Sequence, residues 1–246
     1  WLGEHDPFVR LTVKRTAIAL SKAEETAERL TQLGIKRVYL LSEVALSEEE
    51  INFLDSISQH EENPFRFISI GRLLHWKGFH LGIMAFAKFV KEYSQSEYWI
   101  IGDGPERRNL ENLAKRLGVL DKMKFWGILP RRETFKKLAE CNVLVHPSLH
   151  DSGGWVCVEA MAAGRPVICL NLGGPALQVT EETGFKIPAR TPKQVVEDMT
   201  QAMLKVAIDI EFRKKTICKC KEKVLREFSW FKRGKQIQEI YKTILV

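Results

Sequence analysis

From residue 64 onward, short hydrophobic runs alternate with longer segments in which hydrophobic residues recur every three or four positions. A short hydrophobic run is typical of a buried strand, and the three-to-four spacing is typical of a helix. The predicted strands are 65–70, 98–101, 124–126, 143–146 and 166–170, and the predicted helices are 81–93, 105–117, 133–141 and 155–163. This alternation predicts an α/β fold with a Rossmann-like, doubly wound parallel sheet. The remainder is expected to be mostly helical, ending in an amphipathic helix over 230–245.

Residues 1–63 carry a shorter version of the same pattern. A strand is predicted over 16–21, then a helix that begins at a Ser21–Glu24 capping box, then a strand over 37–41. Two strands and a helix cannot bury a core alone. We therefore interpret 1–45 as the remnant of another α/β domain, 46–63 as an acidic linker with a helical turn, 64–228 as the ligand-binding domain and 229–246 as a C-terminal helix.

The composition indicates a folded protein with an anionic partner. Hydrophobic residues make up 45% of the chain, so global disorder is not expected. The formal charge of +7 suits an anionic ligand, nucleic acid or an anionic membrane face. Much of this excess lies in 213–223 at helical spacing, which favours a solvated helix face, with a peripheral membrane contact as the alternative. Nucleic acid is not expected, because the chain lacks a basic stripe interleaved with aromatic residues.

The five cysteines favour reduced thiols in a cytoplasmic protein. Cys218 and Cys220 have the spacing of half a metal site, but no second cysteine pair or histidine cluster accompanies them. No metal site is therefore expected. No uninterrupted hydrophobic run reaches the length of a membrane span.

Glycines and polar residues gather where the predicted strands end. In a doubly wound sheet these carboxyl ends share one edge, and ligands bind beyond it. The turns at this edge are Gly71-Arg72, Gly102-Asp103-Gly104, Gly127, the 147–154 loop and Gly173-Gly174. Glycines often do no more than punctuate strand-to-helix turns, but five such turns together with Arg72 and Lys77 favour a phosphate ligand.

The stretch 147–164 organises this edge. It reads as the end of a strand, a polar loop with Gly153 and Gly154, and a helix from Trp155. Glycines allow close backbone approach, and the unpaired amides at the start of a helix attract anions. We therefore expect this loop to hold the diphosphate of a sugar nucleotide.

Four charged residues fit such a ligand. Arg72 can bind the diphosphate through two hydrogen bonds and Lys77 as a point charge. Glu159, one turn into the helix, can accept hydrogen bonds from ribose hydroxyls; the alternative is an ordinary surface glutamate. Asp151 can accept from hydroxyls of the donor sugar; the alternative is a residue that caps the helix.

Other residues at the edge give weaker indications. Gly102 and Gly104 do not complete a dinucleotide fingerprint, because Arg107 stands where the third glycine is needed, but their backbone can approach a base. Backbone groups over 126–129 could read a base edge. His146 is interpreted as a satisfied strand-end histidine rather than a catalyst.

The combination of motifs resembles the C-terminal half of a family 4 retaining glycosyltransferase. These enzymes have the GT-B architecture, in which two Rossmann-like domains face each other across a cleft. The resemblance covers about 65–188, with 16–45 similar to the end of the N-terminal domain and 228–246 similar to the segment that crosses back to it. It rests on Gly71-Arg72, Lys77-Gly78, Gly102 to Pro105, Gly127, Pro147-Ser148, Asp151 to Gly164, Pro166 to Ile168 and Gly173-Gly174.

The resemblance implies hexose transfer, with retention, from a nucleotide-diphosphate sugar to a glycan or lipid-linked saccharide in polysaccharide biosynthesis, at the inner face of the plasma membrane. It implies no metal or other cofactor. The base is expected to be uracil, the commonest in the family. The catalytic group would be Arg72, Lys77 and Asp151. The donor would be bound by Gly71, Gly102, Gly104, Trp126, Gly127, Leu129, Ser152, Gly153, Gly154, Trp155, Val156 and Glu159.

Two departures from the family pattern matter. Asp151 stands in place of the family's first glutamate, and Ser152 in place of a usual glycine, so the donor sugar stays open. Most of the N-terminal domain, which carries acceptor binding and a catalytic-loop histidine in the family, has no counterpart in this sequence. We expect donor binding with little or no transfer by the chain alone.

Three alternatives stay open. A non-hydrolysing sugar-nucleotide epimerase shares the architecture, and a non-catalytic domain could bind the same ligand. A glycosidase that uses Asp151 and Glu159 is less favoured, because water attack needs no pair of cations such as Arg72 and Lys77.

Overall fold

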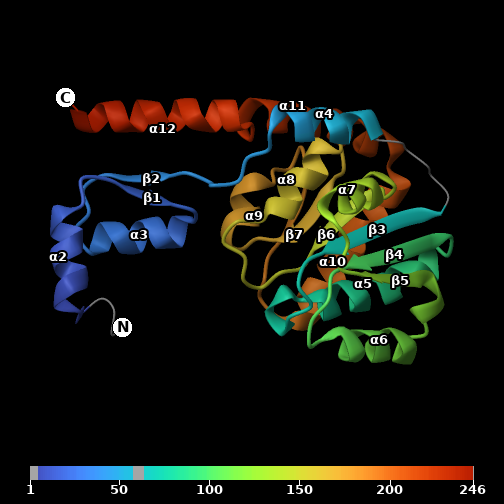
Figure 1. The fold of residues 1–246 in the computed structure, drawn as a ribbon. Coiled ribbons are helices and arrows are strands. Elements are labelled where there is room, and N and C mark those ends of the chain that lie inside the picture. Colours follow the sequence, from blue (N-terminus) through green and yellow to red (C-terminus); the bar gives the residue numbers. More distant parts are fainter. Residues whose placement is uncertain (1–4, 58–63, 246) are drawn as a thin grey trace.

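The computed structural model describes residues 5–57 and 64–245 and contains a six-stranded parallel sheet (Figure 1). The strand order is β5-β4-β3-β6-β7-β8. The strands are β3 (Phe65–Ile70), β4 (Ser96–Ile101), β5 (Met123–Gly127), β6 (Val143–His146), β7 (Val167–Leu170) and β8 (Gly184–Ile187). Numbered from β3, this is the doubly wound order of dinucleotide-binding folds, which confirms the predicted fold class.

Helices cover both faces of the sheet. They are α4 (Glu48–Ile57), α5 (Phe79–Glu92), α6 (Arg107–Arg116), α7 (Arg131–Ala139), α8 (Trp155–Ala162), α9 (Gly173–Gln178), α10 (Pro192–Ile208) and α11 (Ile210–Glu227), with short 3₁₀ helices η1 (His75–Lys77) and η2 (Leu120–Lys122). Side chains of α5, α6 and α10 share one core cluster, and those of α4, α7, α8 and α11 share the other. Neighbouring strand residues enter opposite clusters, as Phe67 and Ile68 do, because strand side chains alternate between faces.

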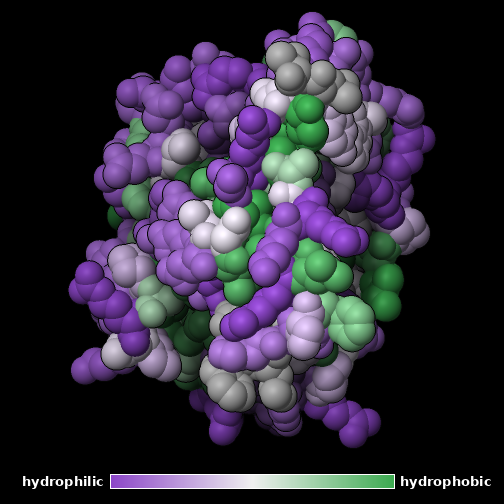
Figure 2. Space-filling model, turned by 90° about the vertical axis from the view of Figure 1, so that its left-hand side faces the viewer, coloured by the Kyte–Doolittle hydropathy of each residue, from purple (hydrophilic) through white to green (hydrophobic). Residues whose placement is uncertain are grey.

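A smaller unit precedes the sheet domain. It contains α2 (Pro7–Arg15), β1 (Ala19–Ser21), α3 (Glu24–Gln32) and β2 (Val38–Leu40), and its two strands pair in parallel. Leu20 and Leu40 are exposed on these strands, as is Phe8 on α2. Figure 2 looks onto this end of the molecule, where hydrophobic patches lie among hydrophilic residues. The unit therefore leaves hydrophobic surface uncovered, as expected for two strands and a short helix.

Two chain segments run side by side between the smaller unit and the sheet domain. The Leu46 amide donates to the Phe228 carbonyl at 2.7 Å, and the Trp230 amide donates to the Leu46 carbonyl at 3.1 Å. Helix α12 (Trp230–Leu245) then runs past β2 (Figure 1), where the Arg37 guanidinium donates to the Thr243 carbonyl at 2.6 Å. The end of α12 thus contacts the smaller unit beside β2.

The sequence prediction differs from the structure in several places. No strand was expected where β8 lies, because 184–187 is short and carries Lys186 in the middle. Helix α3 has no side-chain cap, so the predicted Ser21–Glu24 capping box is wrong. The reciprocal bonds of a capping box occur instead between Ser47 and Glu50.

Helix α4 begins inside the stretch that was interpreted as a linker. Ile51 and Leu54 of this helix are buried in the cluster shared with α7 and α8, and so are Val44 and Leu46 before it. The first part of 46–63 is therefore packed against the sheet domain, while 58–63 lies outside the described residues.

The lysine-rich segment forms α11, where charges are largely paired. Lys214 pairs with Glu211, Lys219 with Glu222, Lys221 with Asp55 and Lys223 with Glu227. These pairs favour the solvated helix face over a membrane patch. Within the described residues, no helix combines the length and hydrophobicity needed to cross a bilayer.

Candidate functional site: the sheet edge between β3 and β6

The connections after β3 and β6 leave the sheet in opposite directions. These strands are neighbours in the sheet, yet β3 leads to α5 on one face and β6 leads to α8 on the other. Such a switch point opens a crevice beyond the carboxyl ends of the strands, where ligands bind in doubly wound folds. The loop after β3 carries Arg72 and Lys77, and the loop after β6 carries Asp151.

These two loops are locked together by backbone contacts. The Leu149 amide donates to the Trp76 carbonyl at 2.8 Å. Gly78 lies so close to the β6 end that an added Cβ would be 2.0 Å from the Pro147 carbonyl oxygen. The loop after β6 is in turn fixed to α9, because the Gly174 amide donates to the Asp151 carbonyl at 3.0 Å.

An ion pair joins the two loops across the crevice. Lys77 Nζ lies 2.6 Å from Asp151 Oδ2, with both side chains four-fifths buried or more. His146 Nε2 lies 3.1 Å from the same oxygen. Burial alone would raise the pKa of Asp151, but hydrogen bonds with His146, Lys77 and the Gly154 amide hold it well below its usual range. Asp151 is therefore a permanent anion at neutral pH.

The other carboxylate oxygen of Asp151 accepts hydrogen bonds from backbone amides of its own loop. Asp151 Oδ1 accepts from the Gly153 amide at 3.2 Å and from the Gly154 amide at 2.9 Å. Asp151 thus fixes the loop before α8 with both oxygens engaged, but it does not cap the helix, whose N-cap is Gly154 with no side-chain cap. The amides of Gly153 and Gly154, predicted as donors to the ligand, are likewise occupied here. Among the described residues, the first helical amides, those of Trp155 and Val156, have no recorded acceptor.

We expect Asp151→Ala to destabilise the fold by about 2 kcal/mol at neutral pH, because it removes two hydrogen bonds to loop amides and a charged pair. In a domain of this size that lowers Tm by about 4–8 °C. The folded pKa of Asp151 is depressed, so its contribution is complete above the unfolded pKa of about 3.9 and is lost as pH falls towards the folded pKa. Thermal unfolding measured from pH 7 to pH 3 should show that the Tm difference between wild type and Asp151→Ala narrows below pH 4. An equal Tm difference for Asp121→Ala, at an exposed position, would contradict this role of Asp151.

The second predicted carboxylate is buried and already paired. The Glu159 side chain is 7% exposed, and its Oε1 accepts from Arg131 Nη1 at 2.7 Å. Burial raises the pKa of Glu159, and Arg131 opposes that rise. The surface-glutamate alternative is therefore wrong. Arg131 was not singled out from the sequence, where it is one of two adjacent arginines just before the helix predicted over 133–141.

The remaining predicted residues line the same edge in a looser arrangement. Arg72 is exposed, and no side-chain partner is recorded for it among the described residues. The Gly102 amide donates to the Gly127 carbonyl at 2.8 Å, so one backbone acceptor of the predicted base site is occupied. The ring of Trp126 packs against Trp99, with centroids 5.2 Å apart, so only the backbone of Trp126 stays a candidate for base contact. Gly71, Gly104, Leu129 and Ser152 lie in turns at this edge.

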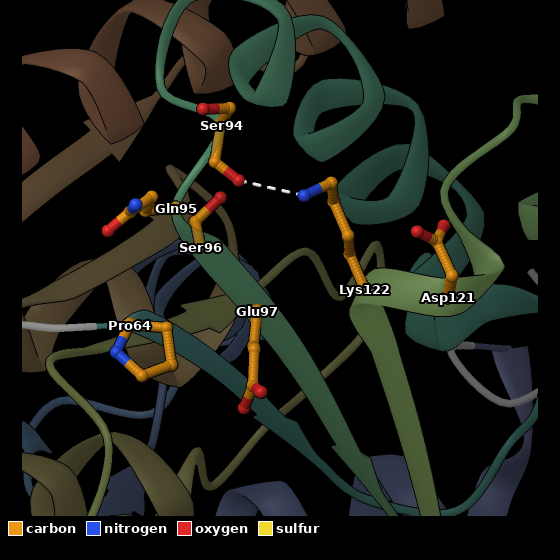
Figure 3. A pocket seen from close by; sticks show the side chains of 7 residues that line it. All are labelled: Pro64, Ser94, Gln95, Ser96, Glu97, Asp121 and Lys122. Carbon is orange, nitrogen blue, oxygen red and sulfur yellow. Dashed lines mark hydrogen bonds between the residues drawn. The ribbon is translucent and has the colours of Figure 1, made fainter.

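A hollow at the opposite end of the sheet contrasts with this site. It has a volume of about 480 Å³ and lies near Pro64, Ser96 and Lys122, at the amino ends of β3 and β4 (Figure 3). Lys122 Nζ donates to the Ser94 carbonyl at 2.8 Å across it. This hollow is far from the helix N-terminus of α8 and from the Lys77–Asp151 pair, so it is not the predicted phosphate site.

Comparisons with known proteins show which family the chain resembles. The chain matches the family described as Glycosyl transferases group 1 over residues 50–222. It is 32% identical over 197 residues to an uncharacterized glycosyltransferase of Methanocaldococcus jannaschii, covering 79% of this chain and 49% of the relative. A lipopolysaccharide core biosynthesis glycosyltransferase of Rhizobium meliloti is 34% identical over 125 residues, covering 51% of this chain and 35% of the relative.

The fold also matches solved structures. The crystal structure of Anabaena HepE in complex with UDP and glucose superposes with a TM-score of 0.76 at 19% identity, covering 95% of this chain and 65% of that one. At this identity the likeness concerns the fold. The chain spans about half the length, or less, of the curated relatives described above.

Proposed function

Because the chain belongs to the group 1 glycosyl transferases, we propose that it is the donor-binding part of a glycosyltransferase that takes a hexose from a nucleotide-diphosphate sugar. The observation that carries this proposal is the placement of Lys77, Asp151 and the α8 N-terminus at the switch point between β3 and β6. A diphosphate there would meet the amides of Trp155 and Val156, the ammonium of Lys77 and the exposed guanidinium of Arg72.

The chemistry follows from this placement. We propose attack on the anomeric carbon from the face that the nucleotide leaves, so that configuration is retained. The bond from the anomeric carbon to the diphosphate oxygen breaks, the acceptor oxygen takes its place, and the diphosphate accepts the acceptor's proton. Lys77, Arg72 and the α8 N-terminus would stabilise the charge that develops on the leaving group.

Glu159 would bind the ribose. Its carboxylate is one turn behind the α8 N-terminus, too close to the phosphate charge to contact it favourably but suited to accept from hydroxyls. UDP is the proposed nucleotide, supported by the UDP in the complex of the similar HepE structure. A glycan or lipid-linked saccharide is the proposed acceptor, in line with the name of the Rhizobium relative.

Thermal shift with UDP-glucose, UDP-N-acetylglucosamine and GDP-mannose tests this proposal. We expect at least one donor to raise Tm, and Glu159→Ala to remove most of that shift. Incubation with radiolabelled donor and no acceptor should leave the sugar unchanged. If the sugar is epimerised instead, the protein is an epimerase and not a transferase. If no donor raises Tm, donor binding is overturned.

A further inference from the structure

A chain of charged side chains connects the proposed ribose carboxylate to the segment between the two units. Glu159 Oε1 accepts from Arg131 Nη1 at 2.7 Å, and Arg131 Nε donates to Glu50 Oε1 at 2.8 Å. The three residues belong to α8, α7 and α4, which lie far apart in the sequence. One guanidinium thus bridges two carboxylates, and it uses different nitrogens for each.

The arginine is held in place by packing as well as by charge. The Arg131 guanidinium carbon lies 4.6 Å from the ring centroid of Phe135, one turn further along α7. A hollow of about 300 Å³ opens beside it, between α4 and α7. A guanidinium that stacks on a ring and donates hydrogen bonds to two carboxylates has little rotational freedom. Its hydrogen bond to Glu159 therefore fixes the direction of that carboxylate.

Glu50 is itself tied to the backbone. Its Oε2 accepts from the Ser47 amide at 3.1 Å, and its own amide donates to Ser47 Oγ at 3.1 Å. Ser47 directly follows Leu46, which is hydrogen-bonded to Phe228 and Trp230 where the two chain segments run side by side. The contacts are therefore continuous from this crossing to Glu159.

The charges explain why the arginine matters. Burial raises the pKa of Glu159, and the nearby Glu50 raises it further. Arg131 is the charged group that opposes both effects. A protonated Glu159 would use one oxygen as a hydrogen-bond donor, whereas both oxygens of the ionised form are acceptors only.

We propose that Arg131 is a positioning residue for the nucleotide ribose: it fixes and charges Glu159, and through Glu50 it links the ribose site to the crossing of the two chain segments. This proposal rests on the proposed function, since it takes Glu159 as the acceptor of the ribose hydroxyls. Arg131 acts through Glu159 and does not itself need to touch the ligand.

The test is discrimination between ribose and deoxyribose. UDP, GDP and ADP are titrated beside their 2′-deoxy counterparts into the wild-type chain and into Arg131→Ala. We expect the wild type to bind one ribonucleotide more tightly than its 2′-deoxy counterpart. In Arg131→Ala the affinity for that ribonucleotide should fall about tenfold. The preference over its deoxy counterpart should fall towards one. Inorganic pyrophosphate should bind both proteins equally, because the diphosphate contacts are separate.

Two further variants control for structure. Arg132→Ala removes the same charge from the adjacent position, whose guanidinium lies over Phe53 at 4.7 Å, and should retain the preference. Arg131→Lys keeps the charge but cannot bridge both carboxylates, and should give an intermediate preference. The positioning role is overturned if Arg131→Ala still prefers the ribonucleotide. It is also overturned if the affinities for pyrophosphate and for the nucleotide fall by the same factor. If the wild type binds no nucleotide, the proposed function fails first.

Discussion

Lys77→Ala is expected to weaken binding of UDP and of inorganic pyrophosphate by on the order of 100-fold, because truncating one partner of a desolvated charge pair costs several kcal/mol. Lys77 is the part-buried cation that reaches the crevice from the loop after β3, and it already lies 2.6 Å from an anionic oxygen of Asp151. A bound diphosphate would share or replace that oxygen. The losses should be equal for the two ligands, since the contact is to phosphate and not to the nucleoside.

Lys88→Ala provides the matched control for this prediction. Lys88 lies in α5, the helix that follows the loop carrying Lys77. It pairs with Glu197 on an exposed surface. Its removal changes the net charge by the same amount and should leave both affinities unchanged. If Lys88→Ala weakens binding as much as Lys77→Ala, the effect is long-range electrostatics and the diphosphate is not at the switch point. If Lys77→Ala weakens UDP alone, the cation contacts some other part of the ligand.

The largest effect on stability is expected for Gly102→Ala. Gly102 has a φ of +129°, which side chains rarely adopt, and an added Cβ would lie 1.9 Å from the carbonyl oxygen of Gly71. The Cβ would be fixed to the backbone at the end of β4, and the oxygen belongs to the backbone at the end of β3, so neither can move without disturbing the sheet edge. Strain and overpacking together should destabilise the fold by about 4 kcal/mol. Tm should fall by about 8–16 °C in thermal unfolding.

Gly118→Ala separates the two causes. Gly118 has a φ of +70°, but an added Cβ there would meet no atom within 4 Å. This variant has the cost of the left-handed backbone alone, about 1–2 kcal/mol. A similar Tm loss in both variants would show that the close approach of Gly102 to Gly71 contributes nothing. A loss several times larger for Gly102 would place the tight β3–β4 contact at the base of the site.

The sheet could be predicted because its signals are local. The strands 65–70 and 143–146 are mostly hydrophobic, and the structure gives the same bounds. The β8 strand was missed since a four-residue segment with a central lysine has too little pattern of its own. Its strand conformation depends on pairing with β7, a contact that only the fold provides.

The site was predictable in its residues more than in its contacts. Lys77, Asp151 and Glu159 were selected from loop positions and charge, and the structure brings the first two together. The Arg131–Glu159 bond joins α7 to α8, 28 residues apart, and nothing in the local sequence marks it. The depressed pKa of Asp151 could not be predicted, because it depends on His146 and on Lys77, which is 74 positions away.

Calorimetric titration of the intact chain with UDP, GDP and ADP tests the central claim most directly. We predict that one of these nucleotides binds with a stoichiometry of one, and that its affinity falls by on the order of 100-fold in Lys77→Ala and is also lower in Glu159→Ala. Heat of binding that persists unchanged in both variants would place the nucleotide elsewhere. If none of the three nucleotides binds the intact chain, the crevice between β3 and β6 is not a donor site.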